Sequence, residues 1–437
     1  MKCIVIPAKL FGLSIRFADV TLDINGDRLK RSMREQAAIG LTAEGGLDRL
    51  TLTDADREVR DWFRAEMEAA GLDVRVDEMG NMFGRRPGTN PDSGTVLLGS
   101  HLDSQPDGGI YDGPLGVLSA LEFVRTLNDH GIKTEHPVEV VNWTNEEGSR
   151  FQPAMMSSGV WAGAIPLEDA YETRDAEGNR FRDELERIGY RGDVPAEPQY
   201  EYDAALELHI EQGPFLDEED RDIGIVTGIV GLRWGEVTFR GEANHTGTTP
   251  MHYRSDALVA ATDVITQIRR IPSTLGERTV GTTGSIAVEP DSINIVPETA
   301  RFTFDLRDPN DAVADEAVER VRHEIEAAAE REGVAYEYEE RMNADSVTFP
   351  ERCVEAVREA AEELGYDGRE LVSGAGHDAT YMASVCDTAM VFAVSEGGKS
   401  HNPEEYTSWA DCYAAAETMA NAALDLAGVA NPDQVNL

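Results

Sequence analysis

The sequence predicts an α/β protein in which one α/β domain is split by a smaller, inserted α+β domain. Length is the first observation, because 437 residues exceed what a single hydrophobic core usually organises. The second is that apolar strands alternate with amphipathic helices in residues 1–228 and again in residues 342–437. The third is that residues 229–341 follow the order β-α-β-β-α-β, which is typical of a ferredoxin-like unit.

The first part of the chain is expected to start with helices and to continue as alternating strands and helices. Thr53 or Asp54 can cap a helix that runs to Ala70 and ends at Gly71. Another helix is expected at Val117–Leu127. The strands expected in this part are Leu72–Val76, Thr95–Leu98, Val138–Trp143 and Ala204–His209.

The inserted domain follows three glycines, Gly224, Gly228 and Gly231, whose spacing is not that of a nucleotide-binding loop and favours a hinge. Its strands are expected at Arg233–Arg240, Val280–Val288, Ala300–Arg307 and Val334–Glu339, and its helices at Ser255–Arg270 and Asp311–Glu330. The α/β pattern then resumes with helix Val354–Leu364, strand Thr388–Ala393 and helix Ala410–Ala427.

The chain is strongly acidic, with 82 Asp and Glu against 39 Lys and Arg and a net charge of -43. Such charge repels itself at low ionic strength, whereas concentrated salt screens it over a few ångströms. The composition therefore indicates a solvated acidic surface, most simply that of a protein living in high salt. It argues against nucleic acid or an anionic membrane as a partner.

The four cysteines are widely separated and form no C-x-x-C motif, which fits a reducing cytoplasm. No apolar run approaches the roughly 20 residues that a membrane-spanning helix needs. Residues 1–19 hold a short apolar patch that Lys9 and Arg16 follow, without a convincing cleavage site. We interpret this segment as an irregular leader or a mis-assigned start, and we expect a cytoplasmic protein.

One glycine-rich loop, Gly99–Gly116, carries His101, Asp103 and Asp112 between an expected strand and an expected helix. Imidazole and carboxylate groups at the carboxyl end of a strand suit a divalent metal. The competing interpretation is a polar loop with an incidental histidine, because short motifs give many false positives.

Other parts of the chain support the metal interpretation. Of nine histidines, five lie in loops rich in Gly, Asp, Asn or Glu: His101, His209, His245, His377 and His401. The adjacent carboxylates Glu146 and Glu147 follow the strand Val138–Trp143 and could instead form a solvated acidic turn. At a strand end beside histidines, one carboxylate can bind metal while the other moves protons.

Taken in order, the motifs resemble the amidase and carbamoylase branch of the M20 metallopeptidase family, over nearly the whole chain from about residue 25. They are Gly-Ser-His-x-Asp-Ser with Gly-Gly-x-Tyr-Asp-Gly, Asn-Glu-Glu-Gly-Ser-Arg-Phe, His-Ile-Glu-Gln-Gly-Pro and Asn-His-Thr-Gly-Thr-Thr-Pro-Met. The resemblance implies a split catalytic domain of the phosphorylase/hydrolase-like α/β type and an inserted domain that dimerises. Members include N-carbamoyl-L-amino-acid hydrolases, β-ureidopropionases and allantoate amidohydrolases.

The resemblance also implies two divalent metal ions per subunit, zinc by preference, with manganese, cobalt or nickel as alternatives. The implied ligands are His101 and His209 on one ion, Glu147 and His401 on the other, and Asp112 between both. Asp103 would orient His101. Glu146 would act as the general base toward a bridging water or hydroxide and then protonate the departing nitrogen.

For the substrate, the resemblance implies Gln212 and His377 as pocket residues, and His245 as a support for the oxyanion. Asn294 and Arg307 would grip a substrate carboxylate. His245, Asn294 and Arg307 lie in the inserted domain, and the resemblance implies that this domain dimerises and that its residues can complete the site of a partner subunit in a homodimer. Arg307 could instead simply pair with Asp305 or Asp308.

Asp103-Ser-Gln-Pro106 and Asn142-Trp-Thr-Asn145 look more like the carbamoyl-amino-acid side of this branch than the allantoate side. The expected reaction is therefore hydrolysis of an N-carbamoyl amino acid, a small ureido compound with a carboxylate, to amino acid, ammonia and carbon dioxide. The alternatives are an allantoate amidohydrolase, an aminoacylase or dipeptidase, and a catalytically silent metal-binding homologue.

Overall fold

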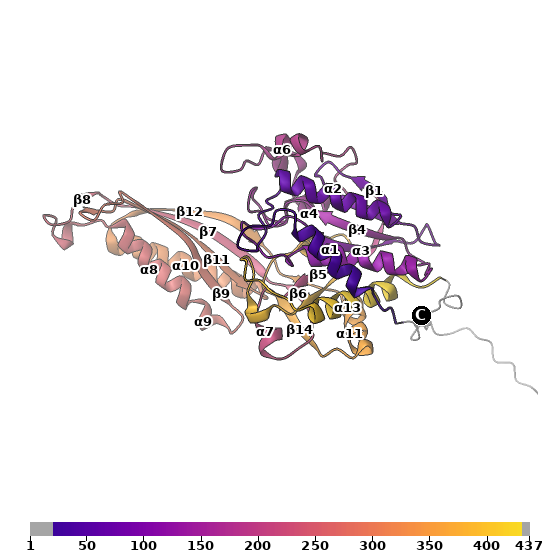
Figure 1. Ribbon diagram of the computed structural model, residues 1–437. Helices are drawn as coiled ribbons and strands as arrows, with labels where there is room; N and C mark the ends of the chain where they lie inside the picture. Colours follow the sequence, from indigo (N-terminus) through magenta and orange to yellow (C-terminus); the bar gives the residue numbers. More distant parts are fainter. Residues whose placement is uncertain (1–20, 431–437) are drawn as a thin grey trace, which may run out of the picture.

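The computed structural model describes residues 21–430, and the leader predicted at residues 1–19 lies outside them (Figure 1). Its backbone forms two main sheets, a large one in the body of the molecule and a four-stranded one that extends away from it (Figure 1). Each has its own cluster of buried apolar side chains. No helix among residues 21–430 is long and apolar enough to cross a membrane.

The large sheet has nine strands. Eight follow the order β1 (Asp73–Val76), β2 (Met82–Arg86), β4 (Val138–Trp143), β3 (Thr95–His101), β5 (Tyr202–Ile210), β15 (Asp387–Ala393), β6 (Ile223–Ile229) and β13 (Val347–Thr348), and β14 (Gly368–Ser373) pairs with β6. The four central strands β4, β3, β5 and β15 are parallel. Their carboxyl ends therefore meet at one edge, which is where open α/β sheets bind ligands.

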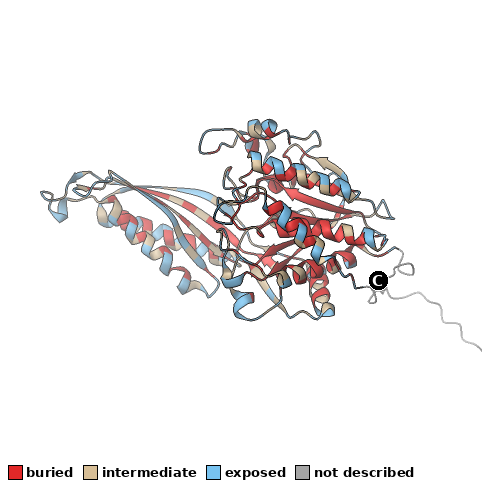
Figure 2. Cartoon of the chain, viewed as in Figure 1, coloured by how far each residue is buried: buried red, intermediate tan, exposed pale blue. Residues whose placement is uncertain are grey.

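Helices cover the large sheet. Every residue of β3 and β4 is buried, as both faces of a central parallel sheet require (Figure 2). Three long helices, α3 (Pro114–Asp129), α11 (Glu351–Leu364) and α13 (Trp409–Ala427), pack against the central strands and on one another. The others in this part are α1 (Gly26–Ala37), α2 (Asp54–Ala69), α4 (Met156–Trp161), α5 (Leu167–Glu172), α6 (Phe181–Ile188), α7 (Phe215–Glu218) and α12 (Ala379–Met382).

The small sheet is antiparallel throughout, in the order β12 (Ala335–Ala344), β7 (Gly231–Arg240), β11 (Thr299–Asp308) and β9 (Val280–Glu289). Helices α8 (Ala257–Arg270) and α10 (Asp311–Glu332) pack on it, and α9 (Pro272–Leu275) follows α8. At its far end the two-residue strands β8 (Asn244–His245) and β10 (Ile295–Val296) form a separate ribbon. The end that bears β8 points away from the large sheet (Figure 1).

The predicted α/β class is confirmed, and the small sheet has the element order β-α-β-β-α-β. Thr53 caps α2 by accepting a hydrogen bond from the backbone N–H of Asp56. Strands β2, β6, β13 and β14 of the large sheet were not predicted from the sequence, and Gly224 and Gly228 lie inside β6. Strand β12 continues to Ala344, past residue 341. The division into domains at residues 229 and 341 stays a prediction.

Candidate metal centre and active site

The site lies where the central strands of the large sheet end. His101 is the last residue of β3 and His209 the last but one of β5. Asp112 comes from the loop between β3 and α3, which turns back over His101 at Gly113. Gly113 has φ +79°, and a Cβ there would lie 2.5 Å from the His101 ring, so only glycine lets the loop approach this closely.

Five predicted ligands form two overlapping groups that share Asp112. In the first, Nε2 of His209 and Nε2 of His101 lie 3.0 and 3.5 Å from Oδ1 of Asp112. In the second, Nε2 of His401 lies 3.4 Å from Oδ2 of Asp112 and 3.6 Å from Oε2 of Glu147. The two oxygens of one carboxylate thus face two different groups of ligand atoms.

The backbone orients both buried imidazoles in the way a metal requires. Nδ1 of His101 lies 3.0 Å from the carbonyl oxygen of Asp103, and Nδ1 of His209 lies 2.9 Å from that of Ile210. A carbonyl accepts only from Nδ1–H, which leaves a lone pair on Nε2 when the imidazole is neutral. Nε2 of His101 is buried and has no hydrogen-bond partner among residues 21–430. A divalent cation fits between these nitrogens and Asp112.

Protons compete for the same positions. Burial alone would lower the pKa of His209, but the Asp112 carboxylate outweighs it and raises that pKa. Burial alone would raise the pKa of Asp112, but His209, His101 and His401 hold it well below its usual range. The carboxylate therefore attracts positive charge, whether from protonated histidines or from metal ions.

The Glu146–Glu147 turn follows β4 and is held by Asp103. The Asp103 carboxylate accepts hydrogen bonds from the backbone N–H groups of Glu146 and Glu147, at 3.3 and 3.4 Å. Its Oδ1 lies 3.6 Å from Nδ1 of His101, farther than the Asp103 carbonyl oxygen. Asp103 thus contacts His101 through its backbone and the glutamate turn through its side chain.

The two glutamates have different surroundings. Oε2 of Glu146 lies 3.6 Å from Nε2 of His101, and burial raises the pKa of Glu146 well above its usual range. Burial also raises the pKa of Glu147 to about 7. The Glu147 carboxylate accepts hydrogen bonds from the backbone and side-chain N–H groups of Gln105. Glu146, a buried glutamate with a raised pKa beside a predicted ligand atom, suits proton transfer.

Gln212 and His377, which the resemblance implies as pocket residues, lie against the predicted ligands Asp112 and His209. Nε2 of Gln212 donates to Oδ2 of Asp112 at 2.7 Å. The His377 ring lies 4.4 Å from the His209 ring, centroid to centroid. Burial, followed by the neighbouring His209, lowers the pKa of His377 well below its usual range, so its ring is neutral.

A cavity of about 240 Å³ lies between the two sheets. Of the residues described so far, those that line it are Gln105, Asp112, Glu146, Glu147, His209, Gln212, His377 and His401. The small sheet contributes Leu232 and Trp234 from β7, Arg307 from β11 and Met342 from β12. Arg307 is the cation of this wall, but its Nε and Nη2 atoms donate to the Asp305 carboxylate and its Nη1 donates to the carbonyl oxygen of Gly374. The pairing with Asp305 that the sequence left open is therefore present.

His245 and Asn294 are not brought to this cavity within one chain. They lie together on the ribbon at the far end of the small sheet, where Ile295 pairs with His245 and the Thr246 N–H donates to the carbonyl oxygen of Asn294. Both side chains are exposed. Their predicted roles would need a second subunit.

Two residues that contact Asp112 and its loop were not predicted from the sequence. Ser400 Oγ lies 3.0 Å from Oδ2 of Asp112, and Glu405 accepts hydrogen bonds from the backbone N–H groups of Tyr111 and Asp112. Burial raises the pKa of Glu405 to about 7. The only signal in the sequence is that both residues belong to the polar stretch around His401.

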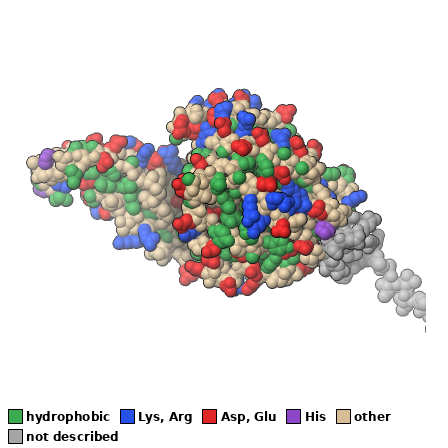
Figure 3. All heavy atoms as spheres, viewed as in Figure 1, with side chains coloured by type: hydrophobic (Ala, Val, Ile, Leu, Met, Phe, Trp, Pro, Cys, Tyr) green, Lys and Arg blue, Asp and Glu red, His purple; other side chains and the backbone are tan. Residues whose placement is uncertain are grey.

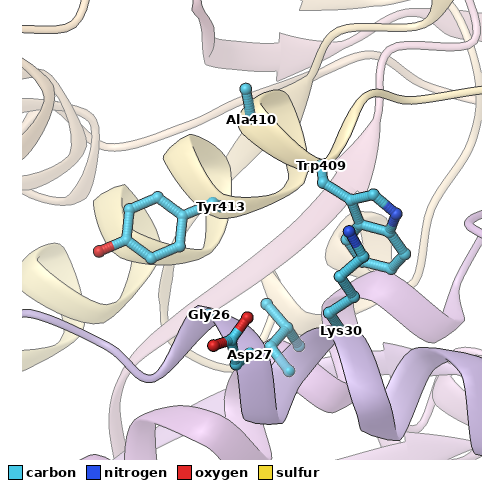
Figure 4. Close-up of a pocket in the computed structure, with 7 residues that line it drawn as sticks. Gly26, Asp27, Lys30, Trp409, Ala410 and Tyr413 are labelled. Carbon is cyan, nitrogen blue, oxygen red and sulfur yellow. The ribbon is translucent and has the colours of Figure 1, made fainter.

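A second cavity, of about 350 Å³, lies between the first turns of α1 and α13 (Figure 4). Its charged residues are Asp27 and Lys30, and the Lys30 ammonium lies 4.9 Å from the centroid of the Trp409 ring. None of the predicted site residues lines it.

An α/β sheet that brings overlapping histidine and carboxylate groups to its carboxyl edge, beside a buried glutamate, has the make-up of a metal-dependent hydrolase. The chain belongs to peptidase family M20/M25/M40, whose sequence profile matches residues 97–425. The family predicted from the motifs is thus confirmed, and the chain is a hydrolase.

The similarity to known proteins extends over most of this chain and of each relative. The N-carbamoyl-L-amino-acid amidohydrolase of Rhizobium meliloti is 47% identical, over 93% of this chain and 97% of the relative. The allantoate amidohydrolase of Bacillus subtilis is 35% identical, over 85% of this chain and 90% of the relative. The crystal structure of an amidase of the hydantoinase/carbamoylase family from Burkholderia multivorans aligns with a TM-score of 0.86 at 46% identity, over 93% of this chain and 98% of that one.

Proposed function

We propose that the protein hydrolyses N-carbamoyl-L-amino acids to the amino acid, ammonia and carbon dioxide. The observation that carries this proposal is the pair of ligand groups on the two oxygens of Asp112, with Glu146 buried beside them. The 47% identity to an N-carbamoyl-L-amino-acid amidohydrolase, over nearly the whole of both chains, supports this substrate class.

The proposal assigns metal binding and proton transfer to different residues. His101 and His209 would hold one divalent ion, Glu147 and His401 a second, and Asp112 both. When bound, such ions polarise a carbonyl group and lower the pKa of water. Glu146 takes a proton from the attacking water and gives it to the departing nitrogen.

Substrate binding would use the wall that the small sheet forms. The Arg307 guanidinium is suited to the carboxylate of the substrate. The apolar side chains of Leu232, Trp234 and Met342 beside it suit an amino-acid side chain. We further propose that His245 and Asn294 act in the site of a second subunit, because both are exposed at the far end of the small sheet.

A substrate panel tests the proposal. Metal-loaded protein in molar salt is assayed for ammonia release from N-carbamoyl-L-amino acids, their D-enantiomers, N-carbamoyl-β-alanine and allantoate. Release of the free amino acid is measured with N-acyl amino acids and dipeptides. Preferred turnover of the L-compounds is expected. Turnover of allantoate alone would replace the substrate class with that of the 35% identical relative. Cleavage of N-acyl amino acids or dipeptides alone would favour an aminoacylase or dipeptidase.

Several finer features belong to this proposal. Zinc is the preferred metal, because mixed histidine and carboxylate ligands suit it, and manganese, cobalt and nickel are alternatives. We propose a cytoplasmic homodimer adapted to high salt, in keeping with the net charge of -43. Metal analysis tests the identity of the metal. The mass of the protein in solution tests whether it is a homodimer.

A further inference from the structure

The Glu405 side chain fills a gap between two loops of the metal centre. Its Oε1 accepts hydrogen bonds from the backbone N–H groups of Tyr111 and Asp112, both at 3.1 Å. Its Oε2 accepts one from Ser400 Oγ at 2.9 Å. Glu405 is only 5% exposed, although it lies in an irregular segment of a strongly acidic chain. A buried carboxylate with three donors is a built contact rather than a solvated surface charge.

The facing loop is shaped to admit this carboxylate. A Cβ at Gly109 would lie 1.8 Å from Oε1 of Glu405, so any larger residue would displace the side chain. Gly109 needs no unusual backbone angle, because it is not among the glycines with positive φ. The lack of a side chain at Gly109 therefore leaves room for the Glu405 carboxylate.

These contacts connect the segment that carries His401 to the loop that carries Asp112. The His401 side chain is 48% exposed and its backbone has φ +57°, whereas His101 and His209 are buried on strands. The position of His401 therefore depends on how its own segment is anchored. Glu405 and Ser400 are the groups in that segment that bond to the Asp112 loop, and Ser400 Oγ also lies 3.0 Å from Oδ2 of Asp112.

We propose that Glu405 is a positioning residue that fixes His401 relative to Asp112 and so forms the second metal position. This inference rests on the proposed metal centre. Glu405 belongs to neither group of predicted ligands and does not line the cavity, and it acts through the loop backbone and Ser400. Residues that orient ligands in this way typically affect metal affinity about 10- to 100-fold.

The test is a zinc titration of the full-length, metal-stripped chain in competition with a chromophoric chelator. Wild type is expected to bind two zinc ions. Glu405→Ala should weaken the second ion about 10- to 100-fold. Glu405→Gln should restore binding to near the wild-type level, because an amide oxygen can accept both N–H groups and its nitrogen can donate to Ser400. Glu404→Ala is the matched control, because Glu404 is exposed and pairs with Lys399.

Gly109 provides an independent readout. Gly109→Ala should weaken the second ion as Glu405→Ala does, whereas adding Gly109→Ala to Glu405→Ala should cost nothing more. Should Glu405→Ala fail to fold, Glu405→Asp replaces it, because its side chain is too short to reach both loops. Wild-type affinity in the Ala or Asp variant, or equal losses in the Gln and Ala variants, would overturn the role of Glu405 alone. A wild type that takes up no second ion would overturn the proposed metal centre as well.

Discussion

Nε2 of His401 lies 3.4 Å from Oδ2 of Asp112, although His401 follows the last strand of the large sheet and Asp112 precedes α3. The other oxygen of Asp112 lies 3.0 Å from Nε2 of His209. One carboxylate therefore lies between predicted ligands from a strand and a loop that come together only on folding. A carboxylate in this position suits a centre in which two cations act on one substrate.

Glu146→Gln separates metal binding from chemistry. Glutamine keeps the size of the side chain but cannot take a proton, so kcat should fall about 10²- to 10⁴-fold. The zinc content should be unchanged, because Glu146 is not among the predicted ligands. Kinetics and metal analysis of the same preparation check both expectations, with Glu218→Gln on the exposed face of α7 as control. Turnover close to that of wild type would exclude Glu146 as the base.

Metal uptake should weaken as the pH falls. Burial raises the pKa of Glu147 to about 7. Burial alone would lower the pKa of His401, but the carboxylates of Asp112 and Glu147 outweigh it and raise the pKa of His401 to about 9. A cation binds only the deprotonated ligands, so each proton that must leave lowers the apparent affinity by about tenfold per pH unit below its pKa. Affinity should therefore rise from pH 6 to pH 8, more steeply below pH 7.

Titration calorimetry checks this pH dependence. Heats of metal binding in two buffers of different ionisation enthalpy count the protons released. Net release at pH 7 is expected, and it should be larger at pH 6, where Glu147 also carries its proton. Binding without proton release across this range would show that the ligands are already deprotonated in the metal-free protein.

The positions of His101 and His209 at strand ends were predictable, because the pattern that indicates a buried strand is local and regular. Apolar runs before His101 and His209 indicate buried strands, and parallel strands bring their carboxyl ends to one edge. Strands β6 and β14 were not predicted, because their sequences lack a clear strand pattern. Two glycines interrupt the apolar run of β6, and β14 mixes charged and apolar residues without a clear alternation. Their pairing comes from the tertiary structure rather than from local propensity.

Contacts distant in sequence were harder to predict. Glu405 bonds to backbone groups 293 and 294 positions away, and no local pattern distinguishes it from the other carboxylates of this acidic chain. For Asp103, the direction of the backbone decides whether the carbonyl oxygen or the carboxylate faces His101, and the sequence alone does not show that direction. The partner of Arg307 was easier to predict, because Asp305 lies two positions away and therefore on the same face of a strand.

Arg307 and Asp305 provide a further prediction. Asp305 occupies Nε and Nη2 of Arg307, so a substrate carboxylate must compete with it. Asp305→Asn should lower KM several-fold, whereas Arg307→Ala should raise KM about 10- to 100-fold through the loss of charge-assisted hydrogen bonds. Steady-state kinetics with an N-carbamoyl amino acid and its carboxamide analogue check this, because the neutral analogue should respond to neither change. Equal effects on both compounds would remove Arg307 from carboxylate binding.

Salt should stabilise the folded chain. Acidic and basic side chains are interspersed on the face seen in Figure 3, yet the net charge is -43, so the long-range balance is repulsive. The Debye length falls from about 30 Å at 0.01 M salt to about 3 Å at 1 M, which removes most of this repulsion. The Tm should therefore rise steeply between 0.01 and 1 M KCl at fixed metal content. Sucrose, which is excluded from protein surfaces but does not screen charge, is the control and should raise Tm much less. A Tm that is insensitive to KCl over this range would mean that charge repulsion does not limit the stability of this chain.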